Sequence, residues 1–215
     1  DGLNRYPEIN NRLKYFDRFY FFDKCDVIDT RGYDRLVPIT NFFFSHLASV
    51  ETNIEKNTFL FLGSYISNRM KSIINTEKLI RSVGGLTNFI VYANSNRMTN
   101  NSEFANISFI YQQIQYIDYI KLVLRSEYIV DILVEEHEGL SFRVFEALGY
   151  KKKLITNNKT IRDYDFYHPS NIFILDEEGR ELSNFLNLPY VEIEKNIIDK
   201  YDFDNWILRI FTWEN

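Results

Sequence analysis

Residues 58–93 read "TFLFLGSYISNRMKSIINTEKLIRSVGGLTNFIVYA" and contain the clearest alternation of apolar runs and helical pattern in the chain. The stretch opens with the short apolar run "TFLFLG", which is typical of a strand buried on both faces of a parallel sheet. The loop "SYISNRM" leads into the helical pattern "RMKSIINTEKLIRSVGG", which Gly84 and Gly85 bring to an end. A second apolar strand, "NFIVYA", follows. The stretch therefore predicts one strand–helix–strand unit.

The same alternation continues toward the C-terminus. The predicted elements are, in order, a strand over 106–111, a helix over 114–127, a strand over 128–134, a helix over 141–148, strands over 152–156 and 171–175, and a helix over 178–186. Strands that alternate with helices predict an α/β fold with a Rossmann-like parallel sheet and helices on both faces. Ligands of such sheets bind beyond the carboxyl ends of the strands, so we expect the loops 63–69, 112–116 and 135–141 on one rim.

A second unit precedes this sheet. Residues 1–48 read as the tail of another α/β unit, with a short helix over 7–15, a strand near 19–22 and an extended segment over 35–44. The polar run "SVETNIEKN" over 49–57 reads as a linker. Because the chain opens without an initiator Met and without the first strands of such a unit, we expect it to be a fragment of a longer protein.

Composition narrows the class of protein. At 215 residues, of which 45% are hydrophobic and 26% charged, the chain can build an ordinary globular core. Its net charge of −5 argues against nucleic acid as the main partner, because such binding rests on clustered Lys and Arg. One cysteine, Cys25, and three histidines argue against a structural zinc site. No apolar run approaches the roughly 20 residues of a bilayer span. We therefore expect a cytoplasmic protein without a metal.

The segment 135–158, "EEHEGLSFRVFEALGYKKKLITNN", carries the strongest site signal. A helix is expected to begin after Ser141, a favourable N-cap residue, and to end before Gly149. The free N–H groups of residues 141–143, together with the helix dipole, would form a seat for an anion such as a phosphate. Gly139 would let that anion approach the backbone closely.

Two glutamates border the expected anion seat. Glu146 lies about one and a half turns into the helix and leans toward its N-terminus, where a carboxylate can accept both hydroxyls of a ribose. Glu138 precedes the helix and would reach hydroxyls on the far side of the phosphate. Ribose, diphosphate and sugar together describe a nucleotide-sugar. The alternative for a helical glutamate is a solvated surface charge.

These residues carry a resemblance to a known family. "HEGLSFRVFEALGYKKKLIT" resembles the paired-glutamate motif of retaining glycosyltransferases with the GT-B fold. The flanking "FDRFYFFDKCD", "FLFLGSYISNRM", "FIYQQIQYIDYIKLVLRS" and "ITNNKTIRDYDFYHPSNIFIL" resemble bacterial glycosyltransferases of lipopolysaccharide, lipooligosaccharide and capsule assembly. The similarity spans nearly the whole chain.

The resemblance implies a domain organisation. In the GT-B fold two Rossmann-like domains face each other, one holding the nucleotide-sugar donor and the other the acceptor. Residues 58–188 would be the donor domain, residues 1–48 the truncated end of the acceptor domain, and 49–57 the linker. Residues 189–215 would form a C-terminal helix that crosses back to the N-terminal domain.

The resemblance also implies roles within the glutamate motif. Glu138 would bind the transferred sugar and count among the catalytic residues, and Glu146 would bind the ribose. The backbone groups expected around the diphosphate belong to Gly139, Leu140, Ser141, Phe142 and Arg143.

Further roles fall on two other loops. In "GSYISNRMK", Gly63 would let the loop approach the phosphates, while Arg69, the second catalytic residue, and Lys71 would neutralise charge on the leaving diphosphate. Gln112 would read an edge of the base. A surface position at the start of a helix is the alternative for Arg69, and an ordinary loop position is the alternative for Gln112.

Two departures from the family pattern leave the donor open. "EHEG" lacks the Pro-Ser that often precedes the first glutamate, and "GYKKKLIT" has three lysines where a Gly-x-Pro turn is common. A nicotinamide-dependent oxidoreductase would need G-x-G-x-x-G after the first strand. "FLGSYISNR" supplies only Gly63 of that pattern.

The resemblance thus implies a glycosyltransferase that moves a sugar from a nucleotide-sugar to a glycan or glycolipid acceptor of the bacterial surface, with retention. It implies no metal cofactor, no nucleic acid, and at most peripheral association with the inner face of the cytoplasmic membrane. As a fragment, the chain is expected to bind a donor without transferring sugar. A degenerate, non-catalytic protein that binds a nucleotide-sugar or an assembly partner remains the alternative.

Overall fold

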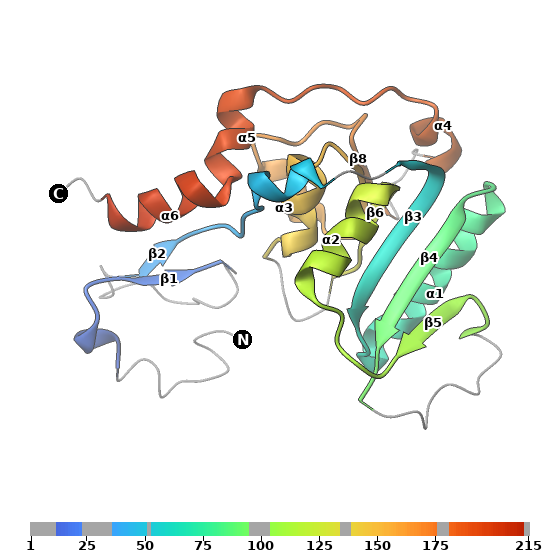
Figure 1. Cartoon of the computed structure of the whole chain (residues 1–215), viewed down its shortest axis with the longest axis horizontal. Coiled ribbons are helices and arrows are strands. Elements are labelled where there is room, and N and C mark those ends of the chain that lie inside the picture. Colours follow the sequence, from blue (N-terminus) through green and yellow to red (C-terminus); the bar gives the residue numbers. More distant parts are fainter. Residues whose placement is uncertain are drawn as a thin grey trace.

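The computed structural model describes residues 12–22, 36–50, 53–94, 104–133, 139–175 and 181–212. Within these ranges the chain forms a main sheet of six strands and a separate pair of strands (Figure 1). The strands are β1 (Phe19–Phe21), β2 (Leu36–Pro38), β3 (Glu55–Ser64), β4 (Leu86–Tyr92), β5 (Ile107–Ile110), β6 (Ser126–Asp131), β7 (Lys153–Thr156) and β8 (Ile172–Ile174). The α-helices are α1 (Ser67–Ser82), α2 (Tyr116–Arg125), α3 (Phe142–Gly149), α4 (Leu182–Leu186), α5 (Lys195–Tyr201) and α6 (Phe203–Phe211). Short 3-10 helices span Leu13–Tyr15, Ser45–Ser49 and Lys159–Asp163 (η7).

The main sheet confirms the predicted Rossmann-like α/β class. Its strands lie in the order β5-β4-β3-β6-β7-β8, and every neighbouring pair is parallel. The chain builds outward from β3 to β5 and then returns through α2 to build the other half from β6. This is the doubly wound order, whose ligand crevice lies where the direction of building reverses. In this sheet that point is between the carboxyl ends of β3 and β6.

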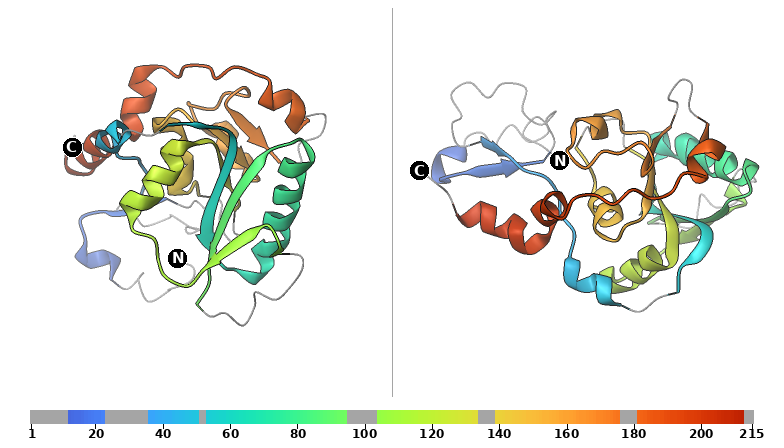
Figure 2. Two further views of the ribbon diagram at one scale, coloured as in Figure 1. Left: turned by 45° about the vertical axis from the view of Figure 1, so that its right-hand side comes forward. Right: turned by 90° about the horizontal axis from the view of Figure 1, so that it is seen from above.

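Apolar side chains cover both faces of the sheet. Because successive strand residues point to opposite faces, Phe59 and Phe61 join the core beneath α1, whereas Leu60 joins the core beneath α2 and α3. Figure 2 shows α1 and α2 on opposite sides of the strands. Burial on both faces explains why the strands read as continuous apolar runs in the sequence.

The sheet begins earlier than the sequence pattern predicts. Strand β3 starts at Glu55, inside the run 49–57 that was assigned to a linker. The backbone of Glu55 pairs with that of Ser126 in β6, and the Glu55 carboxylate forms an ion pair with Arg125 at 2.6 Å. Polarity did not reveal this first part of β3, because its side chains are exposed.

The N-terminal strands pack against the C-terminal helices. β1 and β2 pair in parallel, and α6 runs beside them (Figure 1). Tyr20 donates its hydroxyl to the carbonyl of Ile210 at 3.1 Å, and the indole N–H of Trp206 donates to the carbonyl of Thr40 at 2.7 Å. Among the helices that the structure describes, none combines the length and apolarity needed to span a membrane.

The C-terminal segment forms two helices where one was expected. Asp202 separates α5 from α6 with an extended backbone, at φ −69° and ψ 139°. Its carboxylate accepts hydrogen bonds from the backbone N–H and the hydroxyl of Ser45, at 3.1 and 2.9 Å. These bonds to a segment far away in the sequence favour the break, and the local pattern of residues 190–211 does not contain them.

Candidate functional site

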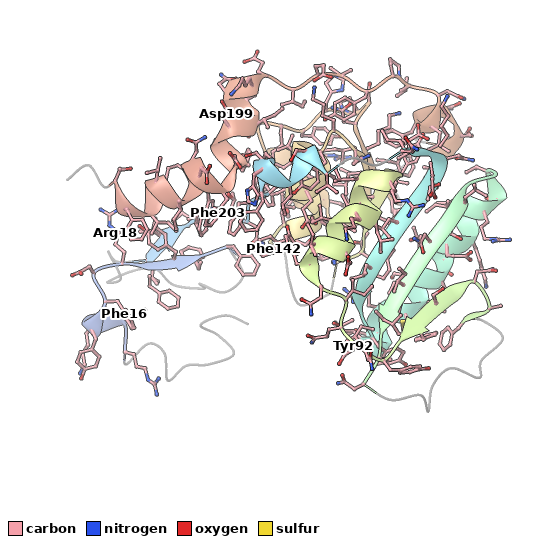
Figure 3. All side chains as sticks on the ribbon, in the orientation of Figure 1. Phe16, Arg18, Tyr92, Phe142, Asp199 and Phe203 are labelled. Carbon is pink, nitrogen blue, oxygen red and sulfur yellow. The ribbon has the colours of Figure 1, made fainter. Side chains whose placement is uncertain are left out.

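The crevice between β3 and β6 gathers charged side chains from three elements, next to the end of β3. Gly63 and Ser64 end β3, Arg69 lies in the first turn of α1, Asp131 ends β6, and Arg143 lies in the first turn of α3. Figure 3 labels Tyr92, at the end of β4, and Phe142, at the start of α3. The parallel sheet therefore places these groups where a doubly wound fold binds its ligand.

Arg69 is buried in this crevice, with 6% of its surface exposed. Its guanidinium donates to the carbonyl of Ser64 and, at 3.4 Å, to that of Ile132. Its Nε is buried without a hydrogen-bond partner among the described residues. Burial, and then the charge of Arg143, lower the pKa of Arg69 to about 10, while Asp131 opposes the shift. Arg69 therefore stays charged near neutral pH.

Arg143 shares the same surroundings. Its Nε donates to Oδ1 of Asp131 at 2.9 Å, and its Nη1 donates to the carbonyl of Leu62 at 2.8 Å. The guanidinium carbons of Arg69 and Arg143 lie 5.7 and 5.8 Å from the centre of the Phe61 ring. Two cations thus share one aromatic ring and one nearby carboxylate.

Asp131 is the carboxylate that the cluster shares. It is 2% exposed, and the Oδ1 that binds Arg143 also accepts the Ser141 hydroxyl at 2.8 Å. We call Arg69, Asp131 and Arg143 the arginine cluster. The cluster has two guanidinium groups and one carboxylate, so its net charge is positive. Because the cluster is largely buried, an anion would interact strongly with it.

Glu146 lies on α3, one turn after Arg143, and is 0% exposed. Its Oε1 accepts the Tyr116 hydroxyl at 2.8 Å, and its Oε2 accepts the Tyr119 hydroxyl at 2.5 Å. Burial raises the pKa of Glu146, although the two tyrosine hydrogen bonds and Arg143 oppose the shift. The carboxylate expected to receive a ribose is therefore covered by two hydroxyls of this chain, and its ribose role stays a prediction.

The other predicted site residues fall in different places. Gly63 sits against Arg69, because a Cβ added there would lie 3.0 Å from Arg69 Nη2. Lys71 is exposed and lies two positions after Arg69, so it faces away from the cluster on α1. Gln112 is exposed after β5, two strands from the crevice. Glu138 lies outside the described residues.

Helix α3 begins where the sequence predicts, but its first turn is not capped by the Ser141 side chain. α3 begins at Phe142 with Ser141 as its N-cap, but the Ser141 hydroxyl is bound to Asp131 and does not cap the helix. Leu140 is buried at 2% exposure, whereas Phe142 is 43% exposed and packs edge-on against Phe42. Gly139 is half-buried.

Sequence reasoning missed four side chains of this site: Asp131, the guanidinium of Arg143, Tyr116 and Tyr119. Asp131 did carry a signal, because it is a lone charge inside the apolar run "YIVDILV" near the carboxyl end of a strand. A charge in such a run needs a buried partner. The two tyrosines carried no comparable signal, because aromatic residues are frequent throughout the chain.

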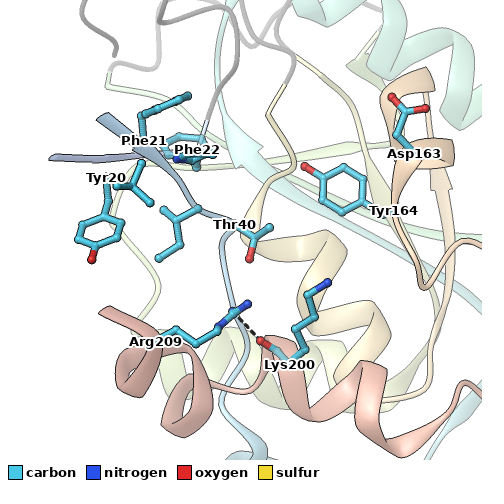
Figure 4. A pocket seen from close by; sticks show the side chains of 11 residues that line it. Tyr20, Phe21, Phe22, Thr40, Asp163, Tyr164, Lys200 and Arg209 are labelled. Carbon is cyan, nitrogen blue, oxygen red and sulfur yellow. Dashed lines mark hydrogen bonds between the residues drawn. The ribbon is translucent and has the colours of Figure 1, made fainter. Parts of the chain in front are cut away.

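A separate cavity of about 390 Å³ lies between β1–β2, α6 and the segment after η7 (Figure 4). Aromatic side chains of Tyr20, Phe21 and Tyr164 line it together with Lys200 and Arg209. Arg209 donates to the carbonyl of Lys200 at 2.6 Å, across the turn between α5 and α6. None of the residues of the arginine cluster lines this cavity.

Comparison with known proteins finds only distant structural similarity. The chain matches no protein-family model and no curated protein. Among solved structures it is similar to "Crystal structure of GtfA/B complex", at 12% identity and a TM-score of 0.45 over 98% of this chain and 41% of that chain. It is also similar to the wall teichoic acid polymerase TagF (H444N + CDPG), at 12% identity and a TM-score of 0.38 over 93% of this chain and 52% of that chain.

The chain thus spans less than two thirds of either solved protein. The class of protein follows from the strand order alone: a Rossmann-like α/β domain with a charged crevice at its switch point.

Proposed function

We propose that this chain contains the donor-binding part of a glycosyltransferase that uses a nucleotide-sugar. The observation that carries the proposal is the arginine cluster at the switch point. Arg69 is buried, keeps one donor unpaired among the described residues, and lies within the electrostatic influence of Arg143 and Asp131, which pair with each other. A diphosphate would supply the missing negative charge and accept hydrogen bonds from that free donor.

The cluster also suits the chemistry of sugar transfer. In that reaction the bond between the anomeric carbon and a diphosphate oxygen breaks, an acceptor hydroxyl oxygen becomes bonded to the same carbon, and the hydroxyl proton is released to the leaving diphosphate or to water. The nucleoside diphosphate leaves with the bonding electrons and gains negative charge. Fixed guanidinium groups in a site sheltered from water stabilise such charge without reorganising. In this proposal Arg69 and Arg143 perform that task, and no metal is needed.

The remaining donor contacts follow from α3. The first N–H groups of the helix face the same crevice and favour an anion. We assign the ribose to Glu146 and the transferred sugar to Glu138. Transfer with retention, a glycan or glycolipid acceptor of the bacterial surface, and a place on the cytoplasmic side of the membrane rest on the resemblance of the sequence motifs.

One observation favours a second candidate, a protein that binds a nucleotide-sugar without transferring it. Glu146 is fully covered, and both of its oxygens already accept hydroxyls of the chain. If those hydrogen bonds are permanent, the Glu146 carboxylate cannot accept the ribose hydroxyls. Nucleotide affinity would then come from the arginine cluster and the base alone.

The proposal is tested by measuring binding and transfer separately. A panel of nucleoside diphosphates and nucleotide-sugars is titrated by calorimetry and scored for thermal stabilisation, since a ligand at 100 times its Kd adds about 2.7 kcal/mol. We expect binding that Arg69→Ala weakens. Acceptor-dependent release of nucleotide distinguishes a transferase from the binding-only candidate. If no member of the panel binds, both candidates are wrong.

A further inference from the structure

Glu146 has the hydrogen-bond partners that a ribose would provide. Its two carboxylate oxygens accept one hydroxyl each, from Tyr116 at 2.8 Å and from Tyr119 at 2.5 Å. A vicinal diol binds a carboxylate through the same pair of O–H···O hydrogen bonds. In the free chain, two tyrosine hydroxyls therefore occupy the positions of a diol.

The two tyrosines differ in how firmly they are held. Tyr119 lies one turn inside α2 and packs against the core beneath that helix. Tyr116 is the first residue of α2, is 40% exposed, and follows the exposed residues 111–113. Among the described residues, its ring has two aromatic neighbours, Phe44 at 5.8 Å and Tyr119 at 6.0 Å. Rotating Tyr116 outward therefore costs less buried area than moving Tyr119.

The covered carboxylate borders the arginine cluster. Glu146 and Arg143 are three positions apart on α3, so their side chains share one side of the helix. A ribose on Glu146 would thus lie about one helical turn, roughly 5 Å, from the guanidinium proposed to hold the diphosphate. This separation suits a nucleotide, whose ribose and first phosphate are adjacent groups.

We infer that Tyr116 is a latch on Glu146 that the ribose diol of a nucleotide displaces. The inference rests on the proposed function, because it deepens the assignment of Glu146. In the free chain the Tyr116 hydroxyl satisfies Oε1 and closes the ribose position. When a ribonucleotide binds, its hydroxyls take over Oε1, Tyr116 turns toward solvent, and Tyr119 keeps its hydrogen bond to Oε2. Nucleotide affinity is then reduced by the latch and depends on the diol.

The test compares ribonucleotides with diol-free analogues. UDP, CDP, GDP and ADP, with the 2′,3′-dideoxy form of each, are titrated by calorimetry against wild type, Tyr116→Phe and Tyr15→Phe. Tyr116→Phe removes the competing hydroxyl and keeps the ring, so we expect ribonucleotides to bind about 3- to 10-fold tighter, as one hydrogen bond allows. Dideoxy analogues should keep their affinity. Tyr15→Phe is the matched control, because Tyr15 is 76% exposed, and it should change the affinity of neither ribonucleotides nor dideoxy analogues.

The outcomes separate the latch from the proposed function. Tighter binding of ribonucleotides alone supports the latch. The latch is overturned if both ligand types change equally, if neither changes, or if ribonucleotides bind more weakly. In each of these cases the proposed nucleotide binding still stands. If none of the nucleotides binds wild type or Tyr116→Phe, the proposed function and the latch are both overturned.

Discussion

Arg143 donates its Nε–H to Oδ1 of Asp131 at 2.9 Å, and the Asp131 side chain that receives it is 3% exposed. The Arg69 and Arg143 guanidinium groups both lie near the Phe61 ring, and the charges of Arg143 and Asp131 both shift the pKa of Arg69. Asp131 is thus the nearby carboxylate on which both cations depend. Removing its charge should therefore affect stability and anion binding together.

Asp131→Asn is expected to lower the free energy of unfolding by about 3 kcal/mol, because it leaves a buried cation pair without its counter-charge. The amide keeps the shape and one acceptor, so the loss comes mainly from charge. Urea unfolding measures it, and millimolar inorganic phosphate should restore more stability to the variant than to wild type.

Asp118→Asn is the matched control for that prediction. Asp118 pairs with Lys121 at 2.7 Å, but both side chains are about half exposed. Such a pair contributes about 0.5 kcal/mol or less. A similar loss at both positions would show that Asp131 does not balance the arginine cluster.

Arg69→Ala is expected to weaken nucleoside diphosphate binding by about 1.5–3 kcal/mol, the range of a hydrogen bond to a charged group. Binding of the bare nucleoside should change little. Because two charges interact, the difference should shrink as salt is added. Calorimetry at two ionic strengths measures both effects.

Lys71→Ala provides the control on the same helix. Lys71 was expected on the diphosphate, but the structure exposes it on the other side of α1 from Arg69. It should leave diphosphate affinity within about twofold, which is below 0.5 kcal/mol. Equal losses for Arg69→Ala and Lys71→Ala would remove the special role of Arg69.

The sequence predicted the sheet well because its central strands β6 and β7, and most of β3, bury both faces. "TFLFLG" and, apart from Asp131, "YIVDILV" are almost entirely apolar, and such runs do not depend on distant partners to be recognised. The position proposed for the candidate site rests on the topology, since the carboxyl ends of parallel strands share an edge. What could not be predicted was which side chains meet at that edge.

Pairings across the fold explain the misses. Lys152 and Lys153 stood out as departures from a family turn, yet both are 6% exposed. The Lys152 ammonium donates to the carbonyl of Leu124 at 2.6 Å, and that of Lys153 donates to the carbonyl of Phe185 at 2.9 Å. These acceptors lie at or near the ends of α2 and α4. Local sequence around residues 152–153 contains no information about them.

Glu146→Gln should change how stability depends on pH. Burial raises the pKa of Glu146 above its ordinary 4.5, so the folded chain holds this proton more tightly than the unfolded chain does. The resulting stabilisation is complete below pH 4.5 and is lost as pH rises through the pKa of the folded state. Glutamine does not titrate and lacks this loss.

Urea unfolding of wild type and Glu146→Gln between about pH 4.5 and pH 8 measures that difference. The stability of wild type relative to the variant should fall as pH rises. Other carboxyl groups titrate in both proteins and cancel in the comparison. A pH-independent difference would show that Glu146 titrates normally despite its burial.

The contact of Gly149 with Phe43 joins α3 to the segment that leads into the sheet. A Cβ added at Gly149 would lie 2.1–2.4 Å from atoms of the Phe43 ring. The Phe43 ring is 2% exposed, and its backbone is held from both sides, by the carbonyl of Tyr201 at 3.1 Å and the N–H of Phe203 at 2.9 Å. The ring therefore has little freedom to move aside.

Gly149→Ala is accordingly expected to lower the free energy of unfolding by about 1–3 kcal/mol, the usual cost of overpacking a core. Without this clash, alanine would stabilise the helix by about 0.5–1 kcal/mol relative to glycine. The control is a double-mutant cycle with Phe43→Ala, which costs about 3–5 kcal/mol alone by opening a cavity. In that background Gly149→Ala should be neutral or stabilising in urea unfolding. If it costs the same with and without the Phe43 ring, steric contact between these residues is not what requires glycine at position 149.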